Sequence, residues 1–384
     1  MNNYKNSDKI NQFKIMKKLF IFILVLISST LFFAQNDKNT INGKVDYFIN
    51  EQMKRSKIPG MAIAVIKNGK IIKKTAYGFA NLDWKNKVTE HTNFQIASCT
   101  KLLTSTLLLK TMYDKKISLE DSVSKYIKDC PIEWIDIKIE NLINHSSGIA
   151  DYYESDLYLP TEKIVEAVKK LPLIFKTGSK QQYGQSDFMV LSYIFEKIYN
   201  KPFVQILKDE VTTPLKMNDG AFDMEYKVNS QFLRTDIIQE KVTTYYDLNG
   251  KMQAYKYLYP QYTYPAGGYF ASIDDMANWA IGLDKEIQFP NSFSENYIYK
   301  TDKIDGKDAD FSKVGWVVGK EDVLYAGHSG GPGLSDILKF PKEGYTFIVL
   351  SNDGELLPMF SRAIASFYIK KLSSKLKIEK FERD

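Results

Sequence analysis

The 384-residue chain has few of the side chains from which metal and redox sites are built. It contains two cysteines and three histidines, and His91, His145 and His328 lie far apart in the sequence. Zinc sites need clusters of these residues at short spacings. The sequence therefore predicts no metal site and no other cofactor. Cys99 and Cys130 could pair in an exported chain, but a free buried thiol is the default for Cys99.

Net positive charge is also scarce once the N-terminal segment is set aside. Lysines precede an apolar run at Leu19–Ile27, and Ala34 stands where cleavage is expected, which is the pattern of a signal peptide. Removal of residues 1–34 takes away five lysines and one aspartate, so the net charge falls from +6 to +2. We therefore expect a periplasmic or secreted chain without a nucleic-acid partner. If it is not cleaved, the signal segment would be the only membrane attachment.

One segment, Phe94–Tyr113, combines a serine with an almost continuous apolar pattern. The leucines that follow Ser98 are too closely spaced for a half-exposed face, which predicts a helix buried nearly all round. Lys101 follows Ser98 by three residues and so shares its face of the helix. Burial lowers the pKa of a lysine toward the range of a useful base. The pair has the local chemistry of a Ser-x-x-Lys acyl-transfer nucleophile.

The Ser-x-x-Lys spacing alone does not identify a nucleophile, because the chain contains it three times. The other two copies, Ser122 to Lys125 and Ser374 to Lys377, lie in polar surroundings and are interpreted as solvated helix faces. For Ser98 the alternative interpretation is a helix N-cap, next to a lysine that extends its head group to water.

Strand patterns lie at both ends of the chain and helix patterns between them. Two strands around Asn68-Gly69 give a strong hairpin signal, and further strands are predicted from Val314 to Ser351. The predicted fold class is α+β: an antiparallel sheet built from both chain ends, flanked by helices, with a mostly helical inserted region.

This pattern also predicts how the mature domain, residues 35–384, is organised. We expect an α/β part, about 40–97 and 265–384, and a helical part, about 98–264. The cleft between the two parts is the default site. Our hypothesis for the tyrosine-rich stretch, Tyr226–Tyr264, is that it lines one wall of this cleft.

Several separate runs resemble the serine β-lactamase and penicillin-binding-protein superfamily. The similarity is closest to its class C β-lactamase, D-Ala-D-Ala carboxypeptidase and esterase branch, and it extends from about Ile58 to the last helix. The runs that carry it are Ile58–Met61, Phe94–Lys101, Leu142–Gly148, Pro214–Met217, Pro265–Gly268 and His328–Gly331. The resemblance implies a β-lactamase/transpeptidase-like fold.

The resemblance also implies roles for three catalytic residues. Ser98 would be the nucleophile and Lys101 its proton partner. Tyr183 stands where the branch has Tyr-x-Asn, and its phenol would relay the proton from Ser98 to the leaving group. A neighbouring ammonium would favour the phenolate, or the phenol and the lysine would share one proton.

Substrate binding is implied for Gln185 and for the run at the third motif. That run would lie on an edge strand facing the nucleophile and would bind substrate through His328, Ser329 and Gly330. The N–H groups of Ser98 and Gly331 would form the oxyanion hole. Gln185 replaces the usual asparagine of Tyr-x-Asn, and His328 replaces the lysine typical of efficient β-lactamases. Both departures put fast β-lactam turnover in doubt.

Three hypotheses for function follow. The first is an exported serine hydrolase that acts through an acyl-enzyme on a D-Ala-D-Ala-type peptide such as a peptidoglycan stem, on a β-lactam or on a small ester. The second is a penicillin-recognising sensor, or a catalytically weak binding protein, that acylates without turnover. The third is a structural, wall-associated domain in which Ser98 is only a helix cap.

Overall fold

The computed structural model describes residues 40–229, 231–320, 322–331, 335–354 and 360–372. The predicted signal peptide and the Ser374 to Lys377 spacing lie outside these ranges. The chain divides into two compact units, Met1–Gln52 and Met53–Asp384, and helix α2, Ile41–Arg55, contains the boundary between them. Within the described ranges, no helix has the length and apolar character that crossing a bilayer requires.

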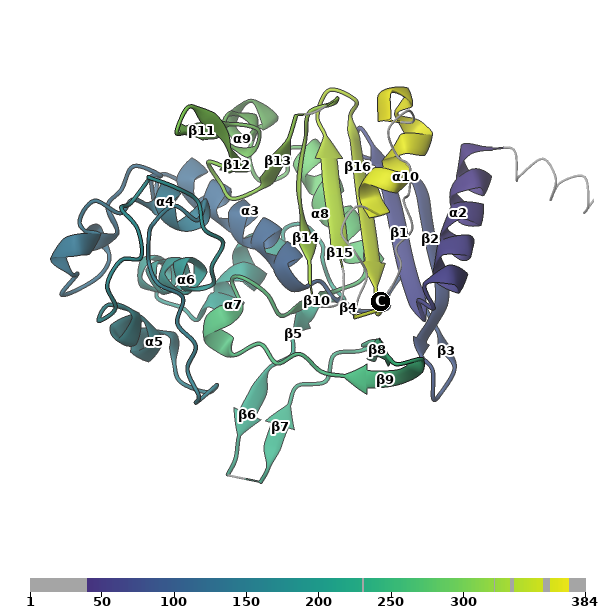
Figure 1. Cartoon of the computed structure of the whole chain (residues 1–384), viewed down its shortest axis with the longest axis horizontal. Coiled ribbons are helices and arrows are strands. Elements are labelled where there is room, and N and C mark those ends of the chain that lie inside the picture. Colours follow the sequence, from purple (N-terminus) through teal and green to yellow (C-terminus); the bar gives the residue numbers. More distant parts are fainter. Residues whose placement is uncertain (1–39, 230, 321, 332–334, 355–359, 373–384) are drawn as a thin grey trace, which may run out of the picture. The chain divides into compact units, whose positions relative to one another are not determined.

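The main sheet has nine strands in the order β11-β12-β13-β14-β15-β16-β1-β2-β3, and neighbouring strands are antiparallel (Figure 1). The C-terminal strand β16 pairs with the N-terminal strand β1, so the sheet is built from both chain ends and the predicted α+β class is confirmed. The strands are β1 Gly60–Lys67, β2 Lys70–Asn81, β3 Asn86–Lys87, β11 Thr301–Ile304, β12 Lys307–Ser312, β13 Val317–Gly319, β14 Tyr325–Gly330, β15 Ser335–Phe340 and β16 Tyr345–Ser351.

The predicted hairpin at Asn68-Gly69 is confirmed and joins β1 to β2 in this sheet. Asn68 and Gly69 have φ values of +48° and +69°, as a two-residue turn that matches the strand twist requires. Helices α8 and α10 pack on opposite faces of the sheet (Figure 1). Ser272 caps α8, because its hydroxyl accepts a hydrogen bond of 3.0 Å from the N–H of Asp275.

The helices between the two groups of strands follow the predicted pattern. They are α3 Thr100–Tyr113, α4 Ile139–Ile143, α5 Thr161–Val168, α6 Ser186–Tyr199 and α7 Phe203–Leu207, continued by the π-helix η4 Lys208–Thr212. The later helices are α8 Ile273–Asp284, α9 Asn291–Ile298 and α10 Phe360–Tyr368. Five short 3₁₀ helices complete this group: η1 Ala97–Cys99, η2 Val123–Lys125, η3 Ile132–Trp134, η5 Gln261–Thr263 and η6 Lys370–Leu372.

Helix α3 is the buried centre of the molecule's helical region. Eleven of its fourteen residues are buried, which confirms the expectation from its apolar pattern. Its buried hydroxyls are satisfied by distant partners: Ser105 and Thr106 accept hydrogen bonds from the indole N–H groups of Trp316 (2.8 Å) and Trp279 (3.0 Å). The polar residues of this helix therefore carry no unpaired buried groups toward the core.

Short strands interrupt the part that was expected to be mostly helical. They are β5 Ala221–Phe222, β6 Glu225–Lys227, β7 Leu233–Thr235, β8 Thr244–Leu248 and β9 Lys251–Tyr255. Strand β5 joins β10, Tyr269–Ala271, and β4, Phe94–Gln95, in a three-stranded sheet of order β4-β10-β5. This small sheet matters because β4 leads directly into Ser98.

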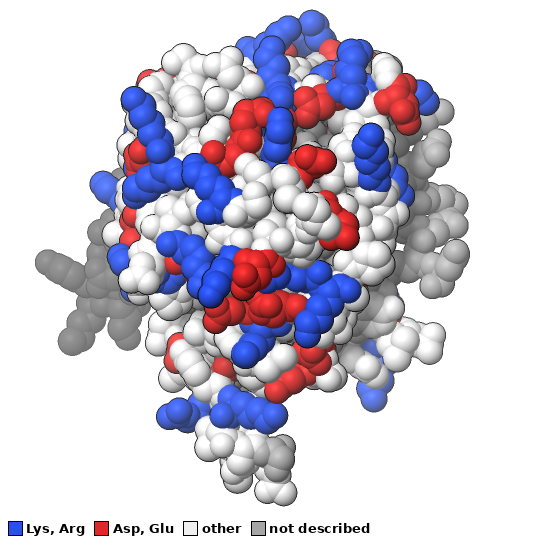
Figure 2. All heavy atoms as spheres, turned by 90° about the vertical axis from the view of Figure 1, so that its left-hand side faces the viewer, with Lys and Arg blue, Asp and Glu red and all other residues white. Residues whose placement is uncertain are grey.

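Charges of both signs are interspersed on the face that carries α4, α5 and α6 (Figure 2). Many are paired: Lys169 contacts Glu166 at 2.8 Å, and Lys313 contacts Glu140 at 2.9 Å. Both cysteines are free thiols, Cys99 buried and Cys130 half-buried, so the disulfide that an exported chain could form between them is not present.

Candidate active site

Ser98 lies in the single 3₁₀ turn η1, immediately before α3. The preceding residue, Ala97, has a φ of +45°, a left-handed conformation that costs a residue with a Cβ about 1–3 kcal/mol. Neither η1 nor α3 has a side-chain cap, so Ser98 does not act as the predicted alternative, a helix N-cap. Instead its hydroxyl oxygen accepts a hydrogen bond of 2.9 Å from the hydroxyl of Tyr183.

Lys101 is buried beneath this pair, with an exposed fraction of 1%. Its Nζ atom donates a hydrogen bond of 2.8 Å to the carbonyl oxygen of Ala266 and lies 4.7 Å from the centroid of the Tyr183 ring. The i,i+3 spacing predicts a contact between Lys101 and Ser98. Among the described residues, however, Lys101 donates its hydrogen bond to Ala266 and not to Ser98. Burial lowers the pKa of Lys101 to about 7, so a large share of this lysine is neutral near neutral pH.

Tyr183 precedes α6 and contacts both Ser98, through its hydroxyl, and Lys101, whose Nζ lies 4.7 Å from the centroid of its ring. Although 43% of the residue is exposed, its hydroxyl faces Ser98. Burial of that hydroxyl raises its pKa to about 12, against the opposing effect of the hydrogen bond with Ser98. The phenol therefore keeps its proton near neutral pH. The site stabilises a neutral lysine beside a neutral phenol rather than a phenolate.

His328 lies on β14 opposite Tyr183, and the two ring centroids are 6.1 Å apart. Its Nδ1 atom is 2.6 Å from the carbonyl oxygen of Ser329. Burial, followed by the nearby charge of Lys101, lowers the pKa of His328 to about 3. This imidazole is therefore neutral and supplies no positive charge to the site.

The rest of the third motif contacts the segment that carries the nucleophile. A Cβ atom on Gly330 would lie 2.3 Å from the carbonyl oxygen of Ile96, so only glycine lets β14 approach so closely. The hydroxyl of Ser329 donates to the buried carboxylate of Asp336 at 2.8 Å. Gly331 is exposed directly after β14. The role of its N–H in an oxyanion hole stays a prediction.

Gln185 lies two residues beyond Tyr183, at the start of α6. Its backbone N–H donates to Oδ1 of Asp151 at 2.6 Å, and the same oxygen accepts from the N–H of Ser186 at 3.0 Å. Within the described part of the chain, the side-chain oxygen Oε1 of Gln185 is buried without a hydrogen-bond partner. An unpaired buried acceptor is costly, and a substrate N–H would satisfy it.

His145 is the principal residue that the sequence did not assign to the site. It is completely buried, and its ring centroid lies 4.6 Å from that of Tyr183. Its Nδ1 atom accepts a hydrogen bond of 3.4 Å from the N–H of Gly184. His145 therefore holds both the ring of Tyr183 and the backbone that follows it.

The hydrogen bonds around His145 define a neutral imidazole. Burial, and then the charge of Lys101, lowers its pKa well below the ordinary value. Because Gly184 donates to Nδ1, the ring proton is placed on Nε2, which is buried without a partner among the described residues. Asp187 lies 3.4 Å from Nδ1, accepts a hydrogen bond from Ser147, and has a pKa raised well above its ordinary value by burial.

A pocket of about 270 Å³ opens beside Tyr183 on the α10 side of β14. Its lining contains one cation, Arg362, which lies 5.5 Å from the ring of Tyr325. The lining residues that bear on chemistry are Tyr183, Phe311, Tyr325, His328, Ser329 and Arg362. The pocket thus shares Tyr183 and His328 with the candidate site.

The tyrosine-rich stretch packs against the loop that holds Lys101. Cβ atoms on Gly267 and Gly268 would lie 2.2 and 2.7 Å from Tyr259, so glycine at both positions allows this ring to sit on the loop after Ala266. The Tyr257 ring is 4.8 Å from that of Tyr259 and is 46% exposed. The stretch thus supports the backbone around Lys101, while its role as a wall of the substrate cleft stays a hypothesis.

The sheet and the grouping of Ser98, Lys101, Tyr183 and His328 define a class: the chain has the fold of the serine β-lactamase and penicillin-binding-protein superfamily. Residues 45–365 match the β-lactamase family, and the chain belongs to that family. The resemblance inferred from the separate sequence runs is therefore confirmed. Membership supports a serine hydrolase or penicillin-binding-protein-like role.

Two relatives from Staphylococcus aureus illustrate the range of this family. Protein flp of strain MW2 is 24% identical over 334 residues, which cover 83% of this chain and 65% of flp. Teichoic acid D-alanine hydrolase of strain MRSA252 is 27% identical over 203 residues, 52% of this chain and 49% of that protein. The chain thus spans less than two thirds of the length of these relatives.

Solved structures give the same fold. The octameric penicillin-binding protein homologue from Pyrococcus abyssi has a TM-score of 0.71 at 22% identity, over 85% of this chain and 77% of that one. FmtA from Staphylococcus aureus has a TM-score of 0.68 at 20% identity, over 87% of this chain and 90% of FmtA. At these identities the likeness establishes the fold alone.

Proposed function

We propose that the chain is an exported serine hydrolase that cleaves an ester or amide through an acyl-enzyme on Ser98. The observation that carries the proposal is the 2.9 Å hydrogen bond between the hydroxyls of Tyr183 and Ser98, above a buried Lys101. A serine becomes an effective nucleophile when a nearby base accepts its proton. The lowered pKa of Lys101, about 7, suits it to that task.

We infer the proton path from two contacts of Tyr183, its hydrogen bond with Ser98 and the approach of Lys101 Nζ to its ring. Ser98 Oγ attacks the substrate carbonyl and gives its proton to the hydroxyl oxygen of Tyr183, which passes its own proton to neutral Lys101; for this step the hydrogen bond between the two hydroxyls reverses, so that Ser98 donates. The tetrahedral intermediate collapses, the bond to the leaving group breaks, and the proton returns to that group. Water then attacks the acyl-enzyme and gives a proton to the same pair, Tyr183 and Lys101; the bond between Ser98 Oγ and the acyl group breaks, Ser98 Oγ takes up the proton, and the acid is released.

The charges around the site favour a substrate whose scissile bond has no carboxylate next to His328. His328 is neutral, because its pKa is lowered to about 3, and the described lining of the adjoining pocket contains the carboxylate of Asp336 as well as the cation Arg362. One relative is named a teichoic acid D-alanine hydrolase. We therefore rank D-alanyl esters and other small esters first, D-Ala-D-Ala peptides such as peptidoglycan stems second, and β-lactams third.

A second function, a penicillin-recognising sensor that acylates without turnover, is supported by one observation. The Oε1 atom of Gln185 is buried and unpaired in the described structure. The amide stands where the branch has asparagine, and one extra methylene changes the place from which it can contact a substrate or a deacylating water. In the sensor the acyl-enzyme would accumulate on Ser98 instead of turning over.

One experiment distinguishes these functions. The mature protein is incubated with p-nitrophenyl acetate, a D-alanyl ester, a D-Ala-D-Ala peptide and a fluorescent penicillin, and intact mass and product release are followed over time. The hydrolase predicts multiple turnovers of at least one ester, whereas the sensor predicts one stable adduct per chain. Ser98→Ala should lose both, while Ser122→Ala, the matched control, should behave like wild type. Equal activity in Ser98→Ala and wild type would refute both functions.

A further inference from the structure

A second cavity, of about 510 Å³, lies between helix α7 and strand β5. One wall is formed by α7 and η4, and the other by β5 and the chain from Asp236 to Ile238. We call it the α7–β5 cavity; the lining residues used below are Lys208, Thr212, Met217, Phe222, Asp236 and Tyr269. Its volume lies within the range of sites that bind small molecules, and it shares no lining residue with the pocket beside Tyr183.

The wall next to α7 departs from regular helix geometry. The N–H of Thr213 donates to the carbonyl oxygen of Lys208 at 2.9 Å, and the N–H of Met217 donates to that of Thr212 at 2.8 Å. Both bonds span five residues, so η4 is a π-helix. Such turns are rare and are frequently found at functional sites. Here the π-helix lies in the wall of the larger cavity.

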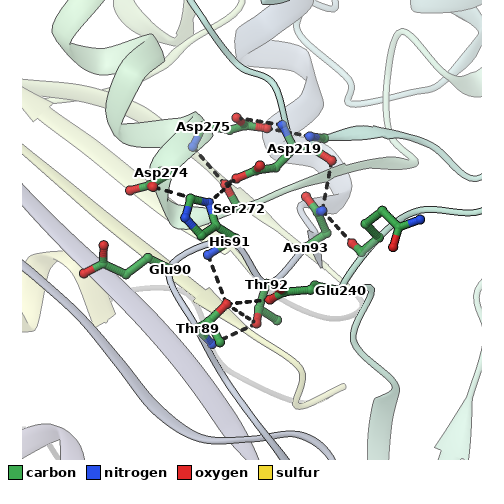
Figure 3. A network of polar contacts seen from close by, with 12 residues as sticks. Thr89, Glu90, His91, Thr92, Asn93, Asp219, Glu240, Ser272, Asp274 and Asp275 are labelled. Atoms are coloured by element: carbon green, nitrogen blue, oxygen red, sulfur yellow. Dashed lines mark hydrogen bonds and ion pairs between the residues drawn. The ribbon is translucent and has the colours of Figure 1, made fainter.

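The edge of the cavity is held by a network of hydrogen bonds (Figure 3). The carboxylate of Asp275 accepts from the N–H of Gly220 at 2.6 Å, and that of Asp219 accepts from the hydroxyl of Ser272 at 2.7 Å. A Cβ atom on Gly220 would lie 2.4 Å from the carbonyl oxygen of Phe270, so glycine permits this close approach. A preformed edge lowers the ordering cost of binding a ligand.

Tyr269 links the cavity to the catalytic segment. Its carbonyl oxygen accepts from the N–H of Ile96 at 2.9 Å, and its N–H donates to the hydroxyl of Thr100 at 3.3 Å. Ile96 and Thr100 flank Ser98 by two residues on either side. The cavity therefore adjoins the strand that positions the nucleophile, although its lining is separate from the catalytic groups.

Among the described residues of the lining, Lys208 and Asp236 carry the charges, and both are exposed. In the described structure neither Lys208 nor Asp236 makes an ion pair; Asp236 accepts a hydrogen bond of 3.1 Å from the hydroxyl of Tyr226. The lining also includes Met217 and Phe222, which are 4% and 3% exposed. A ligand that complements this lining has an ammonium at one end, a carboxylate at the other and apolar groups between them.

We propose that the α7–β5 cavity binds a short peptide, of about two or three residues, with free amino and carboxyl termini and apolar side chains. Asp236 receives the ammonium group and Lys208 the carboxylate, while Met217 and Phe222 contact the side chains. The hydroxyl of Thr212 donates to the carbonyl oxygen of Lys208 at 3.5 Å and accepts a hydrogen bond from the peptide backbone. Binding here involves no covalent step and does not depend on acyl transfer at Ser98.

The proposal is tested by calorimetric titration of the full Ser98→Ala chain with leucyl-leucine, so that turnover cannot consume the probe. We expect saturable binding, and binding at least about tenfold weaker for N-acetyl-leucyl-leucinamide, which lacks both terminal charges. Lys208→Ala and Asp236→Asn should each weaken the binding of leucyl-leucine by about tenfold. The control Lys201→Ala, which removes a nearby lysine paired with Asp209 at 2.7 Å, should leave it unchanged.

Several outcomes would overturn the proposal. These are no saturable binding of leucyl-leucine at millimolar concentration, equal affinity for the blocked peptide, or unchanged affinity in either charge variant. Binding that survives both Lys208→Ala and Asp236→Asn would place the peptide elsewhere, including at the catalytic site. Circular dichroism of each variant confirms that a loss of affinity is not a loss of fold.

Discussion

Two segments of the described chain have the same Ser-x-x-Lys spacing and opposite physical chemistry. In the first, Lys101 is buried and its pKa is lowered to about 7 by burial. In the second, the side chain of Lys125 is 58% exposed and pairs with Asp121 at 3.0 Å, which raises its pKa. The second lysine stays charged at neutral pH, as the interpretation of that segment as a solvated face predicts.

The serines differ in the same way. The hydroxyl of Ser122 contacts its neighbour Ser124 at 2.7 Å and donates to the carbonyl oxygen of Ile135 at 2.8 Å, so it fixes a local turn. Ser98 instead meets a side chain 85 residues away, the hydroxyl of Tyr183. The comparison teaches that the spacing supplies only proximity; burial and the distant phenol supply the chemistry.

The largest effect is expected from Lys101→Met, because it removes the proposed base and leaves an apolar chain of similar length in a buried position. Acylation of Ser98 by p-nitrophenyl acetate should fall by about 10³-fold. Lys125→Met, the same change in the exposed segment, should leave the rate unchanged. Stopped-flow measurement of the acylation burst checks both variants. Equal rates in wild type and Lys101→Met would show that Lys101 is not the base for acylation and does not differ from Lys125 in this respect.

Tyr183→Phe should reduce acylation by about 10²-fold. The ring and its packing on His145 are kept, but the hydroxyl that touches Ser98 is lost. Tyr113→Phe is a suitable control, because Tyr113 has a similar exposed fraction, 46%, at the far end of α3. A wild-type burst rate in Tyr183→Phe would show that this phenol is not the relay.

The pH dependence of acylation should report Lys101. Its pKa is lowered to about 7, so the neutral form predominates above that pH and the protonated form below it. The rate should therefore rise about tenfold per pH unit below about pH 6 and reach a plateau above about pH 8. His328, with a pKa of about 3, and Tyr183, at about 12, titrate outside this window. A flat profile between about pH 5 and pH 9 would contradict the assignment.

The smallest effect is expected from His145→Asn, about tenfold in acylation rate. Asparagine can still accept the hydrogen bond from Gly184, but it cannot pack on Tyr183 as the imidazole does. Because the effect acts through the orientation of Tyr183, it should disappear when Tyr183→Phe is already present. The exposed His91→Asn serves as control. Additive losses in the double variant would show that His145 does not act through Tyr183.

The sequence predicted those parts of the fold that local patterns encode. The hairpin at Asn68-Gly69 needs only a turn that tolerates positive φ, and the buried helix α3 needs only its own apolar residues. Strands β11 and β12 and helix α9 were not predicted. They lie in a polar stretch in which few apolar residues alternate. The edge strands therefore form because neighbouring strands pair with them, and the local alternation of apolar residues does not predict them.

The candidate site was predicted only in part, because sequence motifs identify its residues but not the long-range contacts between them. Ser98, Lys101, Tyr183 and His328 are brought together, but the partner of Lys101 is the carbonyl oxygen of Ala266, 165 residues away. No spacing rule links His145 to Gly184, 39 residues on, because that contact depends on how α4 and α6 pack. Its complete burial beside Tyr183 is visible only in three dimensions.

The measurement that tests the central claim most directly is the location of the acyl group after rapid quench with p-nitrophenyl acetate. Peptide mass mapping should place one acetyl group on Ser98, with none on Ser122, and the yield should rise with pH through about 7 as Lys101 becomes neutral. An acetyl group on any other residue, or a yield at Ser98 that is the same in Lys101→Met, would contradict the account.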